Sequence, residues 1–320
     1  MELSRKGNGV ERVESSAASG AGQDAAGQEP LPAAFRGESL RKDFGKGPVL
    51  NALDFLVPQG AAVGLLGANA SGKTTLLKIL LGLLTPDSGR VSVAGERVEH
   101  MTPELRGRIG YVPQWPAQFA WLTPEAMLTY IAAFYPRFDH DYARSLIERW
   151  QIPLKTPIGA LSPGLQQRLS IVRALAPRPD LIVLDEPIAS VDPLTRTAVI
   201  DELQRLRRER AVTLIFSSHI IGDLRRLCSE FAIVGRGKIT ALRPVEDFAD
   251  LERVIVAGPE SVLAAFDFTS CQQMRKVEEG ERVVLIRHGN ADSWVSALPS
   301  ALWVKSREQD LEMTVSEWMR

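Results

Sequence analysis

Eight residues, Gly67–Thr74, combine glycines, a lysine and a hydroxyl group in a pattern that can hold phosphate. They follow the apolar run Ala62–Leu66, and a helical pattern begins directly after them. In such a strand–loop–helix setting the backbone N–H groups of the loop surround the phosphates of a nucleotide. Lys73 adds a positive charge at the β- and γ-phosphates, and the Thr74 hydroxyl coordinates Mg²⁺. The other residues of this predicted nucleotide site are Gly67, Asn69, Ser71, Gly72 and Thr75.

Two carboxylates stand at the end of a second apolar run. Leu181–Leu184 is typical of a strand buried on both faces, and Asp185 and Glu186 follow it. Beside a phosphate loop, a carboxylate at a strand tip holds Mg²⁺ directly or through water, and we assign that role to Asp185. Glu186 leaves the same edge and is our candidate for the base that polarises the attacking water. Two acids after a strand are otherwise an ordinary solvated loop, so this assignment depends on the phosphate loop.

Further motifs, in a fixed order, make the sequence resemble the ATP-binding cassette (ABC) ATPases. Leu161–Arg168 reads Leu-Ser-Pro-Gly-Leu-Gln-Gln-Arg, resembles the LSGGQ signature and precedes the acid-tipped strand. Four other features agree with this family. Phe44 resembles the A-loop aromatic, and Gln114 resembles the Q-loop glutamine. Ser190–Asp192 resembles the D-loop, and His219 resembles the switch histidine. The resemblance covers residues 35–242, roughly two thirds of the chain.

The resemblance implies a role for each of these residues. In this family two cassettes pair head to tail and enclose two ATP molecules, so Ser162 and the Gly164 N–H would contact the γ-phosphate of ATP held by the partner. Gln114 would sense Mg²⁺ and the attacking water, and His219 would contact the γ-phosphate. Phe44 would stack on adenine. Taken singly, each has a simpler structural interpretation, such as a core aromatic or a helix cap, and only the ordered set favours the functional one.

Three positions depart from the family pattern. Pro163 replaces the first signature glycine, which removes a backbone donor and fixes φ. Leu165 replaces the signature glutamine, and Ala70 replaces a common glycine of the phosphate loop. These changes imply a weaker or slower partner half of the site. We still expect an active ATPase, because the reacting residues remain: Ser162, Gly164, Glu186 and His219.

The alternation of short apolar runs with longer helical patterns predicts an α/β fold with a mainly parallel sheet. The resemblance makes this a P-loop NTPase fold of the ABC type. Besides the two runs above, strands are expected at Val212–Phe216 and Phe231–Val234. Helices are expected to begin after Thr123 and Asp192, because each of these capping residues precedes a proline.

The chain divides into three predicted parts. Residues 1–33 are rich in Gly, Ser, Ala and Gln, and we expect a disordered tail. Residues 34–244 form the ABC ATPase domain, with a helical subdomain at about 115–172 by the family likeness. Residues 245–320 form a C-terminal accessory region, a small α+β unit without a phosphate, metal or nucleophile motif. We expect that region to modulate or dock, with strands at Arg253–Val256, Arg282–Ile286 and Leu302–Val304 and a terminal helix at Asp310–Met319.

The composition excludes several classes of protein. The 320 residues carry 38 basic and 39 acidic side chains, a formal net charge of -1, so no nucleic-acid partner is expected. Two cysteines, Cys228 and Cys271, make no disulfide framework and favour a reducing cytosol. No apolar stretch reaches about 18 residues, so the chain is not expected to span a membrane by itself.

A single cassette without a membrane segment resembles the ATPase subunit of a transporter whose transmembrane permease subunits are separate chains. We expect it in the cytoplasm, peripheral on the inner face of the cell membrane. A second ABC ATPase subunit would complete a homodimer or heterodimer, with ATP and Mg²⁺ as cofactors. Ala133–Asp139 and Asp310–Met319 resemble marks of bacterial cassettes of the drug, bacitracin and lantibiotic export type, which favours an exporter.

Two other classes stay open at this point. One is a soluble ABC ATPase, for example of the iron–sulfur assembly type, which has no membrane partner. The other is a regulator that binds ATP with little turnover, an interpretation that the altered signature supports. Co-purification from detergent-solubilised membranes distinguishes the first from a transporter subunit, and ATP turnover tests the second.

Overall fold

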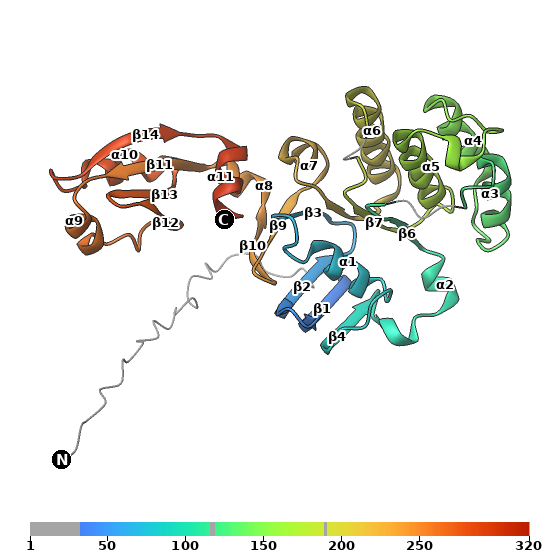
Figure 1. Ribbon diagram of the computed structural model, residues 1–320, viewed down its shortest axis with the longest axis horizontal. Helices are drawn as coiled ribbons and strands as arrows, with labels where there is room; N and C mark the ends of the chain where they lie inside the picture. Colours follow the sequence, from blue (N-terminus) through green and yellow to red (C-terminus); the bar gives the residue numbers. More distant parts are fainter. Residues whose placement is uncertain (1–32, 116–118, 189–190, 320) are drawn as a thin grey trace, which may run out of the picture. The chain divides into compact units, whose positions relative to one another are not determined.

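The computed structural model describes residues 33–115, 119–188 and 191–319 of the chain (Figure 1). The predicted tail, residues 1–33, lies outside the described residues except for Ala33. Ser190 of the predicted D-loop also lies outside them. In the described part, no helix is both long enough and apolar enough to cross a membrane.

A six-stranded, mainly parallel sheet, here called sheet B, carries the fold. Its strands in spatial order are β10 (Lys238–Pro244), β9 (Glu230–Gly235), β3 (Ala62–Leu66), β8 (Thr213–Ser217), β7 (Leu181–Asp185) and β6 (Ile109–Val112). Only β10 pairs antiparallel. Every residue of β3, β7 and β8 is buried, as expected for strands covered on both faces. The predicted α/β fold is therefore confirmed.

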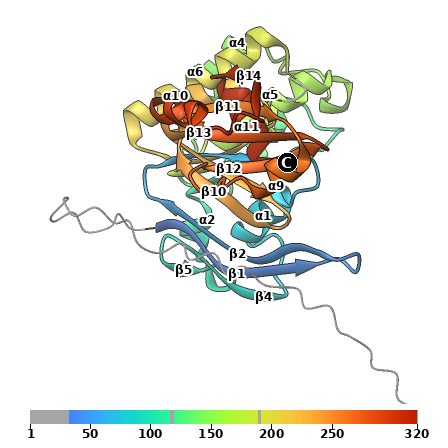
Figure 2. The same ribbon diagram turned by 90° about the vertical axis from the view of Figure 1, so that its left-hand side faces the viewer.

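An antiparallel sheet, sheet A, covers one face of sheet B together with the first helix. Its order is β2 (Pro48–Pro58), β1 (Ala33–Asp43), β4 (Ser88–Val93) and β5 (Glu96–Arg97). Side chains such as Val63 and Val183 pack toward sheet A and α1 (Lys73–Leu80), whereas their neighbours Leu66 and Leu184 pack toward the opposite core. Figure 2 shows β1, β2 and β4 as a separate layer. This sheet is not among the elements expected from the sequence.

The helices of the opposite core begin where the capping signals predicted. The Thr123 hydroxyl accepts from the Ala126 N–H (3.2 Å), and Asp192 accepts from the Thr195 N–H (3.0 Å). The helices on this side are α3 (Pro124–Ala132), α4 (His140–Arg149), α5 (Pro163–Leu175), α6 (Pro193–Arg210) and α7 (Ile221–Leu227). Connecting elements are α2 (Pro103–Arg106) and two 3₁₀ turns, η1 (Val98–His100) and η2 (Ile158–Ala160).

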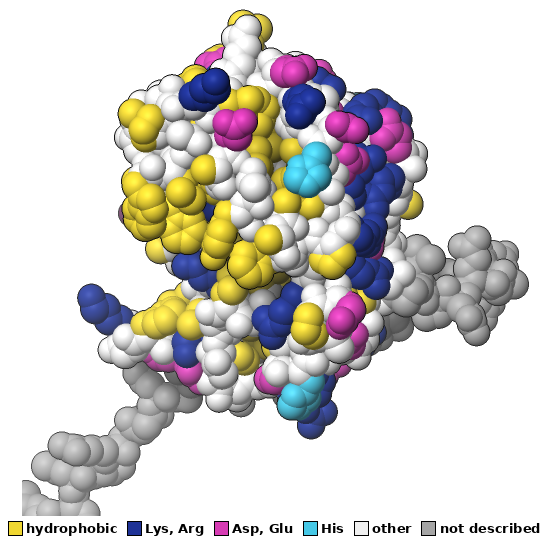
Figure 3. Space-filling view, turned by 90° about the vertical axis from the view of Figure 1, so that its right-hand side faces the viewer, with side chains coloured by type: hydrophobic (Ala, Val, Ile, Leu, Met, Phe, Trp, Pro, Cys, Tyr) yellow, Lys and Arg dark blue, Asp and Glu magenta, His cyan; other side chains and the backbone are white. Residues whose placement is uncertain are grey.

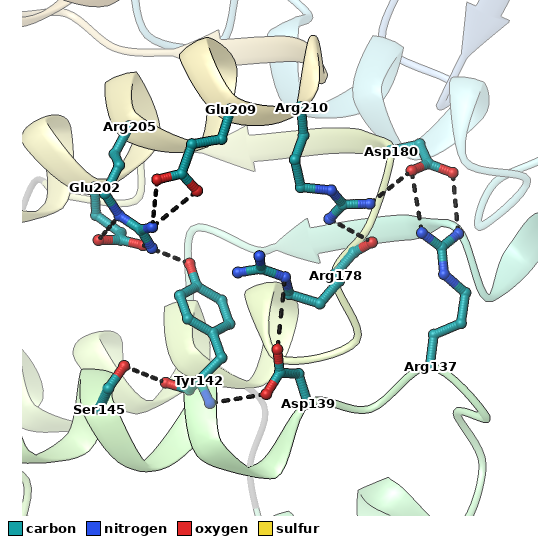
Figure 4. A network of polar contacts seen from close by, with 10 residues as sticks. All are labelled: Arg137, Asp139, Tyr142, Ser145, Arg178, Asp180, Glu202, Arg205, Glu209 and Arg210. Carbon is teal, nitrogen blue, oxygen red and sulfur yellow. Dashed lines mark hydrogen bonds and ion pairs between the residues drawn. The ribbon is translucent and has the colours of Figure 1, made fainter.

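A buried carboxylate ties α4 to α6 (Figure 4). Glu202 of α6 accepts hydrogen bonds from the Tyr142 hydroxyl (2.6 Å), Arg149 (2.6 Å) and Arg205 (2.5 Å), and its side chain is only 1% exposed. Burial and the hydrogen bond to Glu202 raise the pKa of Tyr142 above its ordinary value. Because a buried charge is tolerated only when it is paired, this network fixes the register of the two helices.

The exporter-like stretch Ala133–Asp139 has a structural explanation in the same region. Arg137 donates to Asp180 (3.1 Å), which precedes β7 and also pairs with Arg210 (3.1 Å; Figure 4). Asp139 caps α4 by accepting from the Tyr142 N–H (2.9 Å). These contacts position the helical region against β7 and α6.

The accessory region is built on a third antiparallel sheet, sheet C, in the order β12 (Gln273–Glu278), β13 (Glu281–Arg287), β11 (Leu251–Ala257) and β14 (Trp303–Glu308). Its own core joins the sheet to α9 (Glu260–Ala265) and α10 (His288–Ser296) through residues such as Val256 and Trp294. Two helices, α8 (Val245–Ala249) and α11 (Leu311–Trp318), instead pack into the core of the ATPase domain. Phe248 of α8 and Val315 of α11 are fully buried there. The boundary at residue 245 stays a prediction.

Candidate functional site

The phosphate loop joins β3 to α1 in a backbone conformation that requires glycine at two positions. Gly72 has a φ of +106°, and a Cβ atom there would lie 2.9 Å from the Val49 carbonyl oxygen. At Gly67 a Cβ atom would lie 2.5 Å from the Val234 carbonyl oxygen. Glycine avoids both clashes and leaves the backbone N–H groups of the loop and of the start of α1 available to an anion.

Lys73 lies inside this loop. Its ammonium group donates to the carbonyl oxygens of Gly67 (2.8 Å) and Ala68 (3.1 Å), which fold the side chain back over the loop. Burial lowers the pKa of Lys73, while the negative charges of Glu186 and Asp185 act in the opposite direction. A desolvated ammonium next to free N–H groups is suited to bind the terminal phosphates of a nucleotide.

The two predicted acids diverge at the end of β7. Asp185 is fully buried and accepts from the Ser217 hydroxyl (2.7 Å) through Oδ1, whereas Oδ2 is buried and has no hydrogen-bond partner among the described residues. Glu186 turns away in a left-handed backbone conformation, with a φ of +48°. Its Oε2 lies 2.9 Å from Nδ1 of His219. The structure therefore brings together a buried acid, a second acid and the predicted switch histidine.

Two adjoining cavities lie along the phosphate loop. The first, about 380 Å³, is the phosphate cavity; it is lined among others by Lys73, Thr74, Thr75, Gln114 and Glu186. The second, about 1040 Å³, is the base-side cavity; it is lined among others by Phe44, Lys46, Val234, Arg236 and Thr240. Both cavities share Val49, Asn69, Ala70 and Ser71, so they are continuous along the phosphate loop. Of the predicted ATP residues, Phe44 lines the base-side cavity, Gly72 and Lys73–Thr75 line the phosphate cavity, and Asn69 and Ser71 line both.

The predicted signature residues lie elsewhere. Ser162 caps α5 by accepting from the Leu165 N–H (3.3 Å), and neither Ser162 nor Gly164 lines the phosphate cavity. Pro163 occupies the first position of α5, where an N–H has no partner within the helix, so no helical hydrogen bond is lost. Asp192 caps α6 and pairs with Arg168 of α5. Hydrogen bonds from Thr195 and the Arg168 guanidinium lower the pKa of Asp192 to about 2.

Sequence reasoning missed two contributions to the site. Ser217, at the end of β8, positions both acids, since its hydroxyl donates to Asp185 and its oxygens accept from the Glu186 N–H. A polar residue at the tip of a buried strand was the available signal. Residues of the accessory region also line the base-side cavity, and no pattern along the chain indicated them; they are Gln273, Met274, Arg275, Trp318 and Met319.

A phosphate loop between a parallel strand and a helix, next to an acid-tipped strand, defines a P-loop ATPase. Comparison with known proteins gives the family within this class. The family model described as "ABC transporter" matches residues 50–189. The chain is 35% identical over 212 residues to Nod factor export ATP-binding protein I of Burkholderia lata, covering 65% of this chain and 69% of that protein. It is 33% identical over 208 residues to an uncharacterized ABC transporter ATP-binding protein, YxlF, of Bacillus subtilis, covering 63% and 68%.

Solved structures agree with this relationship. The ATP-binding subunit of an ABC transporter superposes with a TM-score of 0.61 at 29% identity, over 67% of this chain and 91% of that one. The post-hydrolysis cassette MJ0796, bound to ADP and phosphate, shares the fold, with a TM-score of 0.59 at 22% identity, over 66% of this chain and 98% of that one. The chain belongs to the ABC transporter ATP-binding proteins, and it is an ATPase.

Proposed function

We propose that this chain is the ATP-hydrolysing subunit of an exporter and that it acts on separate transmembrane permease subunits. Its relatives include a protein named for Nod factor export, which supports the direction of transport. The binding of this chain to permease subunits would hold it at the inner face of the cell membrane. The observation that carries the proposal is an exposed aromatic surface whose first residue directly follows Gln114 of the phosphate cavity.

That surface, here called the aromatic patch, consists of Trp115, Phe119, Trp121, Tyr130 and Phe134, all exposed. Four of its rings are in contact: Phe119 lies 5.3 Å from Trp121 and 6.0 Å from Tyr130, and Tyr130 lies 5.2 Å from Phe134, between ring centroids. Figure 3 shows hydrophobic side chains gathered on this side of the molecule. Trp115 directly follows Gln114, which lines the phosphate cavity. An exposed cluster of this kind marks a protein interface, and aromatic anchors dominate such interfaces.

The proposed reaction uses the residues at the end of β7. A water molecule attacks the γ-phosphorus, Glu186 accepts its proton, and the bond from the γ-phosphorus to the bridging oxygen breaks to release ADP and phosphate. Lys73 neutralises charge that develops on the leaving oxygens. His219, hydrogen-bonded to Glu186, orients that carboxylate and contacts the γ-phosphate, and Gln114 positions the water.

A magnesium ion fits the phosphate cavity. Asp185 Oδ2 is a buried carboxylate oxygen without a hydrogen-bond partner in the described residues, and such an atom is costly unless a cation or water meets it. Oxygen ligands in small number are what Mg²⁺ prefers at a nucleotide. Asp185, Thr74 and Gln114 would hold the ion, which would neutralise phosphate charge when bound.

A second cassette would complete the site. Ser162 and Gly164 stand at the exposed start of α5, outside their own chain's phosphate cavity. The N-terminal end of a thirteen-residue helix attracts an anion, here the γ-phosphate of ATP on a partner chain. The partner would be a second ABC ATPase subunit, identical or different.

The aromatic patch gives the test of the transporter assignment. We expect the double variant Trp121→Ser, Phe134→Ser to lose co-purification with membrane proteins from detergent-solubilised cells while keeping its affinity for ATP. Trp303→Ser is the matched control, because Trp303 is an aromatic residue of the accessory region that is 57% exposed. Equal recovery of membrane proteins with the wild type and the double variant would contradict the proposal.

A further inference from the structure

The accessory region supplies part of the wall of the nucleotide pocket. The base-side cavity is lined on one side by Phe44 and the phosphate loop, and it is also lined by Gln273, Met274 and Arg275 of β12. The end of α11 contributes Trp318 and Met319. β12 is an edge strand of sheet C.

A bound ATP molecule must extend toward this wall. Its triphosphate is expected at Lys73 and Thr74, in the phosphate cavity. The base-side cavity continues the phosphate cavity, because the two share Asn69, Ala70 and Ser71. Its volume of about 1040 Å³ is sufficient for a ribose and a purine base.

Ion pairs hold β12 and α11 together. Glu317 of α11 is 3% exposed and accepts from Arg275 of β12 (2.8 Å) and from Arg253 of β11 (3.1 Å). The Gln273 amide donates to the Glu317 carbonyl oxygen (3.3 Å). Because the buried carboxylate is paired with Arg275 of β12, β12 and α11 are held together.

The same wall is attached to the ATPase domain. Arg243 of β10 donates to Gln272 (3.0 Å), and its guanidinium lies 5.2 Å from the Trp318 ring centroid. Trp318 in turn meets Phe248 edge to face, at 6.2 Å between centroids. Residues on both sides of the base-side cavity are therefore connected by direct contacts, and the wall is not a loosely tethered surface.

The chemistry of the wall suits a nucleobase. Met274 is 44% exposed and Phe44 is 57% exposed, so the cavity contains two accessible apolar side chains that can cover the faces of a purine.

We propose that β12 and the end of α11 form the base-side wall of the ATP site in the same chain, with Met274 in contact with the purine ring. This inference rests on ATP binding at the phosphate loop and extends it to the accessory region. The accessory region then discriminates the base of the nucleotide, and nucleotide occupancy stabilises the position of this region against the ATPase domain.

The test compares two exposed side chains of one strand in the full chain. Met274→Ala removes the proposed contact, and Met274→Leu restores an apolar side chain of similar volume. Val277→Ala is the matched control, because Val277 lies on β12, is 46% exposed and does not line the cavity. Dissociation constants are measured for ATP and for inorganic tripolyphosphate, which carries the phosphates without ribose or base.

We expect Met274→Ala to weaken ATP binding by about fivefold, the effect of losing a single apolar contact, and to leave tripolyphosphate binding unchanged. Met274→Leu and Val277→Ala should both bind ATP as the wild type does. Unchanged ATP affinity in Met274→Ala would overturn the proposal, and so would an equal loss for ATP and tripolyphosphate. Lys73→Ala should weaken both ligands; if it weakens neither, the fault lies with the phosphate site and not with the wall.

Discussion

Glu186 occupies a backbone conformation that few side chains adopt. Its φ of +48° costs an estimated 1–3 kcal/mol, which the surroundings must offset. The compensating contacts come from Ser217, whose carbonyl oxygen (3.1 Å) and hydroxyl oxygen (3.0 Å) both accept from the Glu186 N–H. A strained but fully hydrogen-bonded turn separates the two adjacent acids and presents one of them to the cavity, which is the geometry expected of a general base.

Lys73 permits a direct test of the phosphate site. We expect Lys73→Ala to lower ATP affinity by about 1.5–3 kcal/mol, because it removes a charge-assisted hydrogen bond to phosphate. Lys78→Ala, on an exposed position of the same helix, should bind ATP as the wild type does. The measurement is a titration of a fluorescent ATP analogue against the three proteins. Equal affinities for all three would remove Lys73 from the site.

At the scale of the element, the sequence predicts those helices and strands whose signal lies within a few consecutive residues. Apolar runs of four or five residues predicted β3, β7, β8 and β9, and capping prolines predicted the starts of α3 and α6. The phosphate loop could be recognised because one short segment carries its whole chemistry. Pro163 raised doubt about the signature, but its place at the first position of α5 makes it compatible with the helix.

Elements that depend on distant partners escaped prediction. β12 reads Gln-Met-Arg-Lys-Val-Glu, with few apolar residues, and it forms a strand only because β13 pairs with it. β1 contains several register shifts against β2, which obscure the alternation expected of a strand. The part played by β12 in the nucleotide pocket depends on tertiary contacts, such as Arg243 with Gln272, and these have no signature along the chain.

The helix pair α4 and α6 should show a pH dependence that originates in Glu202. Burial alone would raise the pKa of Glu202, but hydrogen bonds from Arg205 and Tyr142 hold this pKa below the ordinary value of 4.5. A lowered pKa stabilises the folded state above the ordinary value, and this contribution is lost as the pH falls through the lowered pKa. Glu202→Gln should therefore lose about 3 kcal/mol at neutral pH and show a weaker acid dependence of stability.

Glu209→Gln is the control for Glu202. Glu209 pairs with the same Arg205 (2.7 Å) but is 43% exposed, so its replacement should cost under about 1 kcal/mol. Urea unfolding of the three proteins, at neutral pH and at about pH 4, gives the comparison. Similar losses in the two variants would show that burial does not set the contribution of Glu202.

At the scale of the whole molecule, the proposed pairing would place one half of each composite site on each chain. The phosphate cavity is formed within the chain, whereas Ser162 and Gly164, the residues that resemble the signature, do not line it. The accessory region, by contrast, reaches the nucleotide pocket of its own chain through β12 and α11. ATP would thus be surrounded by the ATPase domain, by the accessory region of the same chain and by the signature of a second chain.

Glu186→Gln tests this composite arrangement. The amide keeps the shape of the side chain but cannot accept the proton of the attacking water, so turnover should fall by about 10²–10⁴-fold. Magnesium binding should persist, because Asp185 and Thr74 are unchanged. ATP would then remain intact, and the dimer that it holds together should accumulate in size-exclusion chromatography with ATP. Wild-type phosphate release by this variant would remove Glu186 as the base. Loss of turnover without a dimer would retain the base and show that the isolated chain does not pair through its Ser162 surface.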